Sequence, residues 1–220
     1  TVYVMQFREN TPIDIDLDSL NLAYTTFIYG DDKDGNQVEL AKISRGANRI
    51  PVSIDRIPQH VRDAFVYIED ERFYEHAGVD WKRTFGAFLN ELTHGMLYGS
   101  KQGGSTITQQ LVKNVTGDKE QNMDRKMREI FRAADLEKYR TKDEILDAYL
   151  NCVGMGGSCS GVQAAALKYF GKDVSELDLA EAACLAAIPK SPESLNPFAN
   201  KEANRERQLL VLKAMYNNAA

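Results

Sequence analysis

In three stretches of the chain, reactive or charged residues recur at positions i, i+4 and i+7. The three groups are Glu69, Phe73 and His76; Thr106, Gln110 and Lys113; and Arg125, Glu129 and Arg132. Because an α-helix turns by ~100° per residue, this spacing places three side chains on a narrow arc of one helix face. One such group is typical of a solvated helix, where an i, i+4 ion pair stabilises by only ~0.2–0.5 kcal/mol. Three groups together indicate a site for a phosphorylated substrate.

The second group follows a glycine pair that suits anion binding. Gly103-Gly104 precedes Ser105 and gives a flexible approach to an expected helix start. The free N–H groups and partial positive charge of a helix start favour anions. The cations that would assist are Lys113, Arg125, Arg128 and Arg132. The stretch lacks the Gly-Lys-Ser/Thr ending of a P-loop, so nucleotide phosphate is not the expected ligand.

Two carboxylates accompany these cations. Glu69 and Glu129 are expected to come together on folding, one as a base and the other in a supporting role. Paired carboxylates in a helical domain suggest glycosyl chemistry.

The elements that position these residues change in type near residue 55. Alternating apolar residues predict strands around Val2–Val4, Ile13–Leu17, Tyr24–Tyr29 and Val38–Ile43, with a hairpin turn at Asp34-Gly35. Helical spacing then predicts helices near 58–73, 80–98, 105–116, 120–139, 142–151, 160–170, 178–188 and 200–217. Asp80 is an expected helix cap, and Thr141 with Glu144 and Asp178 with Glu181 form expected capping boxes. We therefore expect a mainly α protein: a β-rich segment over residues 1–55 and one helical domain over residues 56–220.

Composition narrows the classes of function. The 220 residues are 43% hydrophobic and 27% charged, as in ordinary globular domains, and no run approaches the ~18 apolar residues of a membrane span. The net charge of −5 argues against a nucleic-acid partner. Cys152, Cys159 and Cys184 form neither a zinc spacing nor a disulfide framework, although their separation leaves a Cys152–Cys159 bridge open.

Four ordered motifs resemble the peptidoglycan glycosyltransferases of family 51, found in class A penicillin-binding proteins and monofunctional transglycosylases. The motifs are EDERFYEHAG at 69–78, GGSTITQQLVKN at 103–114, RKMRE at 125–129 and KDEILDAYLN at 142–151. The second matches without a departure, and the whole resemblance covers roughly residues 50–217.

The resemblance implies a lysozyme-like helical head and a smaller, membrane-facing jaw over roughly residues 80–118. The implied reaction polymerises lipid II into glycan strands with inversion, and polyprenyl pyrophosphate leaves. Glu69 corresponds to the general base on the acceptor 4-hydroxyl, and Glu129 to a second acidic residue that organises the pyrophosphate. No cofactor is required, although a divalent cation (Mg²⁺ or Mn²⁺) at Glu129 and the pyrophosphate is an option. The corresponding substrate-binding residues are Asp70, Phe73, His76, Ser105, Thr106, Gln109, Gln110, Lys113, Asn114, Arg125 and Lys126.

Partners and location follow from that substrate. We expect the chain to bind lipid II and the growing glycan strand and to touch the membrane surface through the jaw. The apolar stripe over residues 84–98 would make this contact with lipid. The alternative interpretation is that the stripe packs into the protein core. Other cell-wall synthesis proteins are candidate partners. The chain would be an excised ectodomain at the extracytoplasmic face of the cell membrane. No Ser-x-x-Lys acylation motif is present, so cross-linking is not predicted.

Two other functions stay open at this point. A lytic enzyme of the same helical class would need one acid and no phosphate cluster. A non-catalytic module that binds lipid II or the cell wall would need neither carboxylate.

Overall fold

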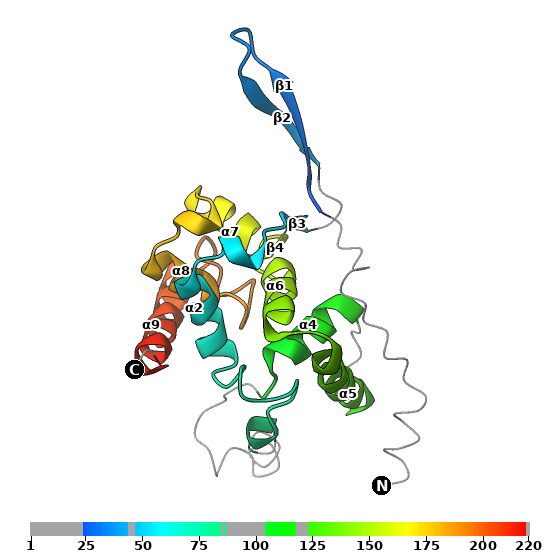
Figure 1. Cartoon of the computed structure of the whole chain (residues 1–220). Coiled ribbons are helices and arrows are strands. Elements are labelled where there is room, and N and C mark those ends of the chain that lie inside the picture. Colours follow the sequence, from blue (N-terminus) through cyan, green and yellow to red (C-terminus); the bar gives the residue numbers. More distant parts are fainter. Residues whose placement is uncertain (1–23, 44–46, 85, 87–103, 118–122, 219–220) are drawn as a thin grey trace. The chain divides into compact units, whose positions relative to one another are not determined.

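A computed structural model describes residues 24–43, 47–84, 86, 104–117 and 123–218 (Figure 1). Its strands are β1 Thr26–Asp31, β2 Gln37–Ile43, β3 Asn48–Arg49 and β4 Cys159–Ser160. Its helices are α2 Gln59–Glu69, α4 Ile107–Thr116, α5 Met123–Tyr139, α6 Lys142–Cys152, α7 Val162–Phe170, α8 Leu179–Ala186 and α9 Lys201–Asn218, with short 3-10 turns at Ile54–Arg56 and Val174–Glu176. The mainly α fold class is therefore confirmed. Within the described residues, no helix is both long enough and apolar enough to cross a bilayer.

The chain divides into two compact units, and the described residues of the first lie within Phe65–Tyr149. In this unit α4 packs against α5 (Figure 1). The sequence of α4 explains the packing, because Ile107 and Leu111 lie one turn apart and both are fully buried, as their spacing predicts. Phe65, Phe73 and Ile145 are also fully buried in the same unit.

The second unit spans Asn21–Ala64 and Leu150–Ala220. Strands β1 and β2 form an antiparallel hairpin with a register shift between Ile28 and Tyr29. The predicted turn at Asp34-Gly35 is confirmed: Gly35 adopts a positive φ of 81°, and the Asp34 amide donates to the Asp32 side chain at 2.8 Å. Helices α8 and α9 pack against each other.

Local capping signals are confirmed. Asp178 and Glu181 form a capping box at the start of α8. Thr141 and Glu144 exchange hydrogen bonds at the start of α6, with Thr141 N donating to Glu144 Oε2 at 2.7 Å.

Other expectations differ or lie outside the described residues. Helix α2 ends at Glu69 instead of residue 73, because the chain turns there to bury the Asp70 side chain. The parallel pair of β3 with β4 was not anticipated. The strands expected within residues 1–20 lie outside the described part of the chain, and the helix expected over 80–98 is described at residues 81–84 and 86, where it is helical. Cys152 and Cys159 are free and buried, so the open disulfide is not formed.

Candidate active site

Glu69 lies at the end of α2, and its carboxylate is held by the next motif along the chain. Gln110 Nε2 donates to Glu69 Oε2 at 2.9 Å. Tyr149 in turn donates its hydroxyl to Gln110 Oε1 at 3.3 Å, which fixes the orientation of the amide. Glu69 is half-buried as a residue, and its Oε1 atom is buried.

Asp70, the next residue, is fully buried and accepts hydrogen bonds from three elements. The backbone N–H of Ile107, at the first turn of α4, donates to Asp70 Oδ2 at 2.9 Å. His76 Nε2 lies 3.0 Å from the same oxygen, and Arg83 Nη1 donates to Oδ1 at 3.3 Å. A buried carboxylate is stable when it is paired and hydrogen-bonded in this way. Asp70 therefore connects the end of α2 to the start of α4.

The first group of the sequence does not share one helix face, and that expectation is wrong. Phe73 and His76 lie in turns beyond the end of α2. Phe73 is fully buried, and the Lys142 ammonium sits 4.4 Å from its ring centroid. Lys142 also donates to the His76 carbonyl at 2.7 Å. These contacts fold the segment after Glu69 back onto the start of α6.

Thr106 and Gln109 form a capping box at the start of α4. The Thr106 side chain accepts from the Gln109 amide at 3.1 Å, and the Gln109 side chain accepts from the Thr106 amide at 2.8 Å. The Thr106 hydroxyl also donates to the Gly78 carbonyl at 2.6 Å. Both side chains are fully buried. The contacts of Thr106 and Gln109 thus set the position and direction of α4.

Position 78 requires glycine, because the backbone there is in the left-handed conformation and lies close to α5. Its φ is 80°, and a Cβ at this position would meet the Ala133 carbonyl oxygen at 2.3 Å. The first motif therefore approaches α5 backbone to backbone.

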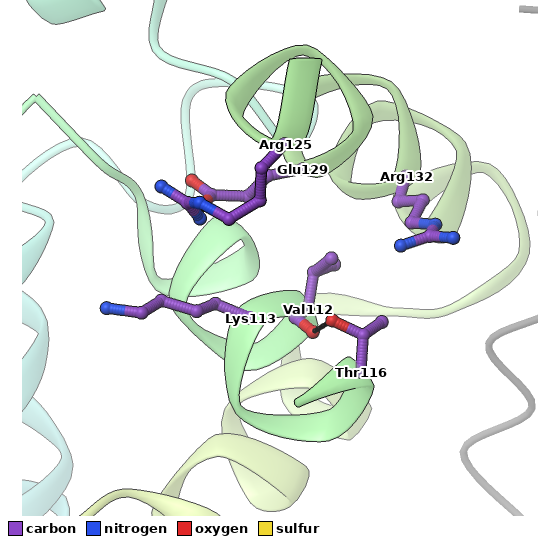
Figure 2. A pocket seen from close by; sticks show the side chains of 6 residues that line it. All are labelled: Val112, Lys113, Thr116, Arg125, Glu129 and Arg132. Carbon is purple, nitrogen blue, oxygen red and sulfur yellow. Dashed lines mark hydrogen bonds and ion pairs between the residues drawn. The ribbon is translucent and has the colours of Figure 1, made fainter. Parts of the chain in front are cut away.

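Cationic side chains gather where α4 faces α5. Figure 2 shows a pocket lined by Val112, Lys113 and Thr116 of α4 and by Arg125, Glu129 and Arg132 of α5. The head groups of Lys113 and Arg125 lie at one end, and Arg132 lies at the other end beyond Val112 (Figure 2). Lys113 is exposed and forms no ion pair with another residue in the described ranges. Lys113 thus places an uncompensated positive charge beside this small pocket.

Glu129 organises the cations on the α5 side of this pocket. Arg125 Nη1 donates to Glu129 Oε2 at 2.7 Å, and Lys126 forms an ion pair with Glu129 Oε1. Lys126 also donates to the Ser105 hydroxyl at 2.9 Å, which links α5 to the start of α4. Glu129 is buried, and Asn114 lies exposed beside Lys113 on α4.

A second ion-paired cluster follows the first motif. Arg72 binds Asp80 through both ends of its guanidinium group, with a closest distance of 2.7 Å. Asp80 also accepts from the Arg83 amide at 3.0 Å, which confirms the predicted cap. Burial acts to raise the pKa of Asp80, but the Arg83 amide and the Arg72 guanidinium outweigh it and hold this pKa below its usual 3.8.

The structure adds two residues that the sequence did not single out. Tyr149 contacts Gln110, which holds the Glu69 carboxylate, and Arg83 contacts the Glu69 backbone carbonyl. Tyr149 lies within the fourth motif, but no spacing linked it to Gln110, 39 residues away, and Arg83 lies outside all four motifs, 14 residues from Glu69. Among the residues that the structure describes, no three His, Cys, Asp or Glu side chains cluster as metal ligands would.

Comparison with known proteins identifies the family. A family model described as Transglycosylase matches residues 36–216. Penicillin-binding protein 1A of Clostridium tetani is 41% identical over 199 residues, which cover 90% of this chain and 25% of that protein. Penicillin-binding protein 1F of Bacillus subtilis is 44% identical over 168 residues, which cover 76% of this chain and 23% of that protein.

Among solved structures, a crystal structure of Penicillin-Binding Protein 1A from Haemophilus influenzae aligns with a TM-score of 0.47 and 25% identity. That alignment covers 88% of this chain and 18% of the other. The chain therefore spans about a quarter or less of the length of these relatives. Because the family model matches most of its residues, the chain belongs to the transglycosylase family.

Proposed function

We propose that the chain is a peptidoglycan glycosyltransferase that polymerises lipid II into glycan strands by inverting transfer. The 4-hydroxyl of an incoming lipid II attacks the anomeric carbon at the reducing end of the growing strand, and polyprenyl pyrophosphate leaves. Family membership supports the reaction class, and the contacts of Glu69, Lys113 and Arg125 support the assignment of roles.

Glu69 is the proposed general base. A sugar hydroxyl is a weak nucleophile at neutral pH, and a carboxylate that accepts its proton in the transition state contributes ~10²–10⁴ in rate. The base must be oriented, and Gln110 holds one oxygen of Glu69 at 2.9 Å. Glu69 is half-buried as a residue while its Oε1 atom is buried, so the acceptor hydroxyl would have to reach an oxygen that the protein shields from water.

Lys113 and Arg125 are the proposed ligands of the leaving group. Negative charge grows on the pyrophosphate as the glycosidic bond breaks, and fixed cations stabilise that charge. Arg125 presents a planar fork that suits phosphate oxygens, whereas Lys113 acts as a mobile point charge. Glu129 holds Arg125 and Lys126 in place at this end of the pocket, so its proposed role is to organise the cations.

One observation carries this assignment: helix α4 both holds the proposed base and lines the proposed leaving-group site. Gln110 of α4 holds the base, and Lys113, three residues later on the same helix, lines the cationic pocket. Residues three apart in a helix are neighbours on its surface. Helix α4 thus fixes the proposed base relative to the proposed leaving-group site, and a lytic enzyme would have no use for that pocket.

We propose that the reaction requires no cofactor. A divalent cation on the pyrophosphate would need Glu129 as its protein ligand, and that carboxylate is already neutralised by Arg125 and Lys126. The side chains present therefore fit cationic stabilisation by arginine and lysine better than a metal site.

The substrate also suggests where the chain works. Lipid II carries a polyprenyl tail, so we propose that the chain acts at the extracytoplasmic face of the cell membrane and touches its surface through the jaw. Of that jaw, the described part includes Trp81, which is 64% exposed. Exposed indole rings suit the interface between lipid and water. Contacts with the growing glycan strand and with other cell-wall synthesis proteins belong to the same proposal.

Polymerisation of labelled lipid II in detergent tests the proposal. The parent chain, Glu69→Gln and the matched control Glu71→Gln are compared, with folding checked by circular dichroism. Glu71 is an exposed carboxylate two residues away, so its loss is expected to leave polymerisation unchanged. Glycan from the parent and the control, with none from a folded Glu69→Gln, is the expected result.

Two outcomes would contradict it. Normal polymerisation by Glu69→Gln would refute Glu69 as the base. A parent chain that binds lipid II but makes no glycan in any detergent or divalent ion would favour a binding module instead.

A further inference from the structure

We propose that Arg83 is a positioning residue that holds the catalytic base in place, an inference that rests on the proposed function. Both terminal nitrogens of Arg83 donate to the Glu69 backbone carbonyl at 3.0 Å. Nη1 also donates to Asp70 Oδ1 at 3.3 Å. The side chain is 17% exposed, so these contacts are largely shielded from water.

The Glu69 carbonyl needs such a partner because of its place in the helix. Glu69 is the last residue of α2, and the final carbonyls of a helix have no partner within it. A cation at this end also matches the partial negative charge of the helix. The planar guanidinium satisfies the carbonyl and the neighbouring carboxylate together, which an ammonium group does less well.

Glu69 is consequently held at two points. Arg83 fixes its backbone, and Gln110 fixes its carboxylate. Asp70 joins the two supports, because it binds Arg83 and also accepts from the Ile107 amide at the start of α4. Loss of Arg83 would free the end of α2 while Gln110 and Lys113 stayed on α4.

Arg83 is itself held firmly. Its backbone amide donates to Asp80 at 3.0 Å, and Asp80 is bound by Arg72 on its other side. The contacts of Arg83 point to the backbone of the base and to a buried carboxylate, which are groups of the protein and not of the substrate. The role is therefore positioning and not catalysis.

This role predicts a particular kinetic signature. A displacement of ~1 Å at the reacting groups costs up to ~100-fold in rate, so Arg83→Ala is expected to lower kcat by about 10- to 100-fold. KM is expected to change by less than about threefold, because Arg83 does not bind substrate. The kcat of Arg83→Lys is expected to lie between those of the parent and Arg83→Ala, since lysine keeps the charge but loses the planar guanidinium group.

The experiment measures kcat and KM for lipid II polymerisation in the parent, Arg83→Ala and Arg83→Lys. Lys82→Ala is the matched control, because it removes an exposed cation from the neighbouring position and leaves the contacts of Glu69, Asp70 and Asp80 intact. Guanidinium chloride at millimolar, non-denaturing concentration is then added to Arg83→Ala, and partial recovery of kcat is expected. Amide hydrogen exchange over residues 65–75 is measured in parallel, and faster exchange is expected in Arg83→Ala than in Lys82→Ala.

Several results would overturn the inference. These are an unchanged kcat per folded Arg83→Ala molecule, a loss confined to KM, or unchanged hydrogen exchange over residues 65–75. If Arg83→Ala does not fold, Arg83→Lys decides the matter, and a folded lysine variant with parental kcat and exchange overturns it. A parent chain without activity refutes the proposed function, whereas the exchange measurement still decides whether Arg83 holds this segment.

Discussion

Replacement of Asp70 by Asn removes a buried charge while it keeps the size of the side chain. The native carboxylate accepts from the Ile107 amide, His76 and Arg83. An Asn side chain offers one acceptor oxygen and turns an NH₂ group toward donors, so at least one of these three groups loses its partner. Arg83 also loses the negative charge of its buried ion-pair partner.

The cost follows from burial. Asp70 is fully buried, so water cannot replace the lost contacts. Leaving a buried donor unsatisfied costs about 1–3 kcal/mol, and breaking a buried ion pair costs about 3–5 kcal/mol. We therefore expect Asp70→Asn to lower the free energy of unfolding by about 3 kcal/mol. For a chain of this length, that corresponds to a melting temperature about 6–12 °C lower.

Thermal melting by circular dichroism measures this effect, and Lys113→Ala provides the opposite case. Lys113 is exposed and lines the cationic pocket, so its loss is expected to leave the melting temperature nearly unchanged while turnover falls by about 100-fold. An Asp70→Asn variant that melts like the parent while its KM for lipid II rises would refute the reasoning and make Asp70 a substrate ligand. A Lys113→Ala variant that polymerises normally, or whose melting temperature falls sharply, would refute the proposal that Lys113 serves turnover and not stability.

Two further predictions concern the pH dependence of stability and the metal dependence of polymerisation. The folded-state pKa of Asp80 is lower than its usual 3.8, so Asp80 stabilises the fold above that value and loses its contribution as pH falls through the folded pKa. The difference in urea midpoint between the parent and Asp80→Asn should therefore be full at neutral pH and shrink below about pH 4, and a constant difference would contradict this. Exhaustive chelation should leave polymerisation within about twofold, because Arg125 and Lys126 already neutralise Glu129. Strict dependence on added Mg²⁺ or Mn²⁺ would instead assign the ion to the pyrophosphate.

The parts of the fold that the sequence predicted well depend on local chemistry. The capping boxes at Thr141 and Asp178 and the turn at Gly35 are set by a few adjacent residues, and all three are confirmed. The end of α2 was misplaced because it depends on a tertiary contact. The Asp70 carboxylate meets an amide 37 residues away, and no local pattern records that contact. Strands β3 and β4 are each two residues long and lie still further apart in the sequence. They are too short to show the alternation of apolar and polar residues from which strands were predicted.

In the candidate site, too, features set by nearby residues were predicted and features set by tertiary contacts were not. The spacing of Gln110 and Lys113 predicted a shared helix, and α4 contains both. The grouping of Glu69 with Phe73 and His76 failed because the helix ends before the second residue of the group. Arg83 carried no signal at all, since an arginine after a cap is common on helix surfaces and its partner is a backbone carbonyl. Sequence patterns predict which side chains share a face of one helix better than they predict which side chains stabilise the chain at a helix end.

These contacts also divide the residues of the second motif by task. Thr106 and Gln109 form the capping box that starts α4, whereas Gln110 contacts Glu69 and Lys113 lines the pocket. About two helical turns of sequence therefore determine both the position of α4 and the chemistry of its exposed face. A change at the cap would displace Gln110 and Lys113 together, so its kinetic effect would resemble loss of a catalytic group. Roles within such a motif are consequently separated by stability and kinetics measured on the same variants, and activity alone cannot separate them.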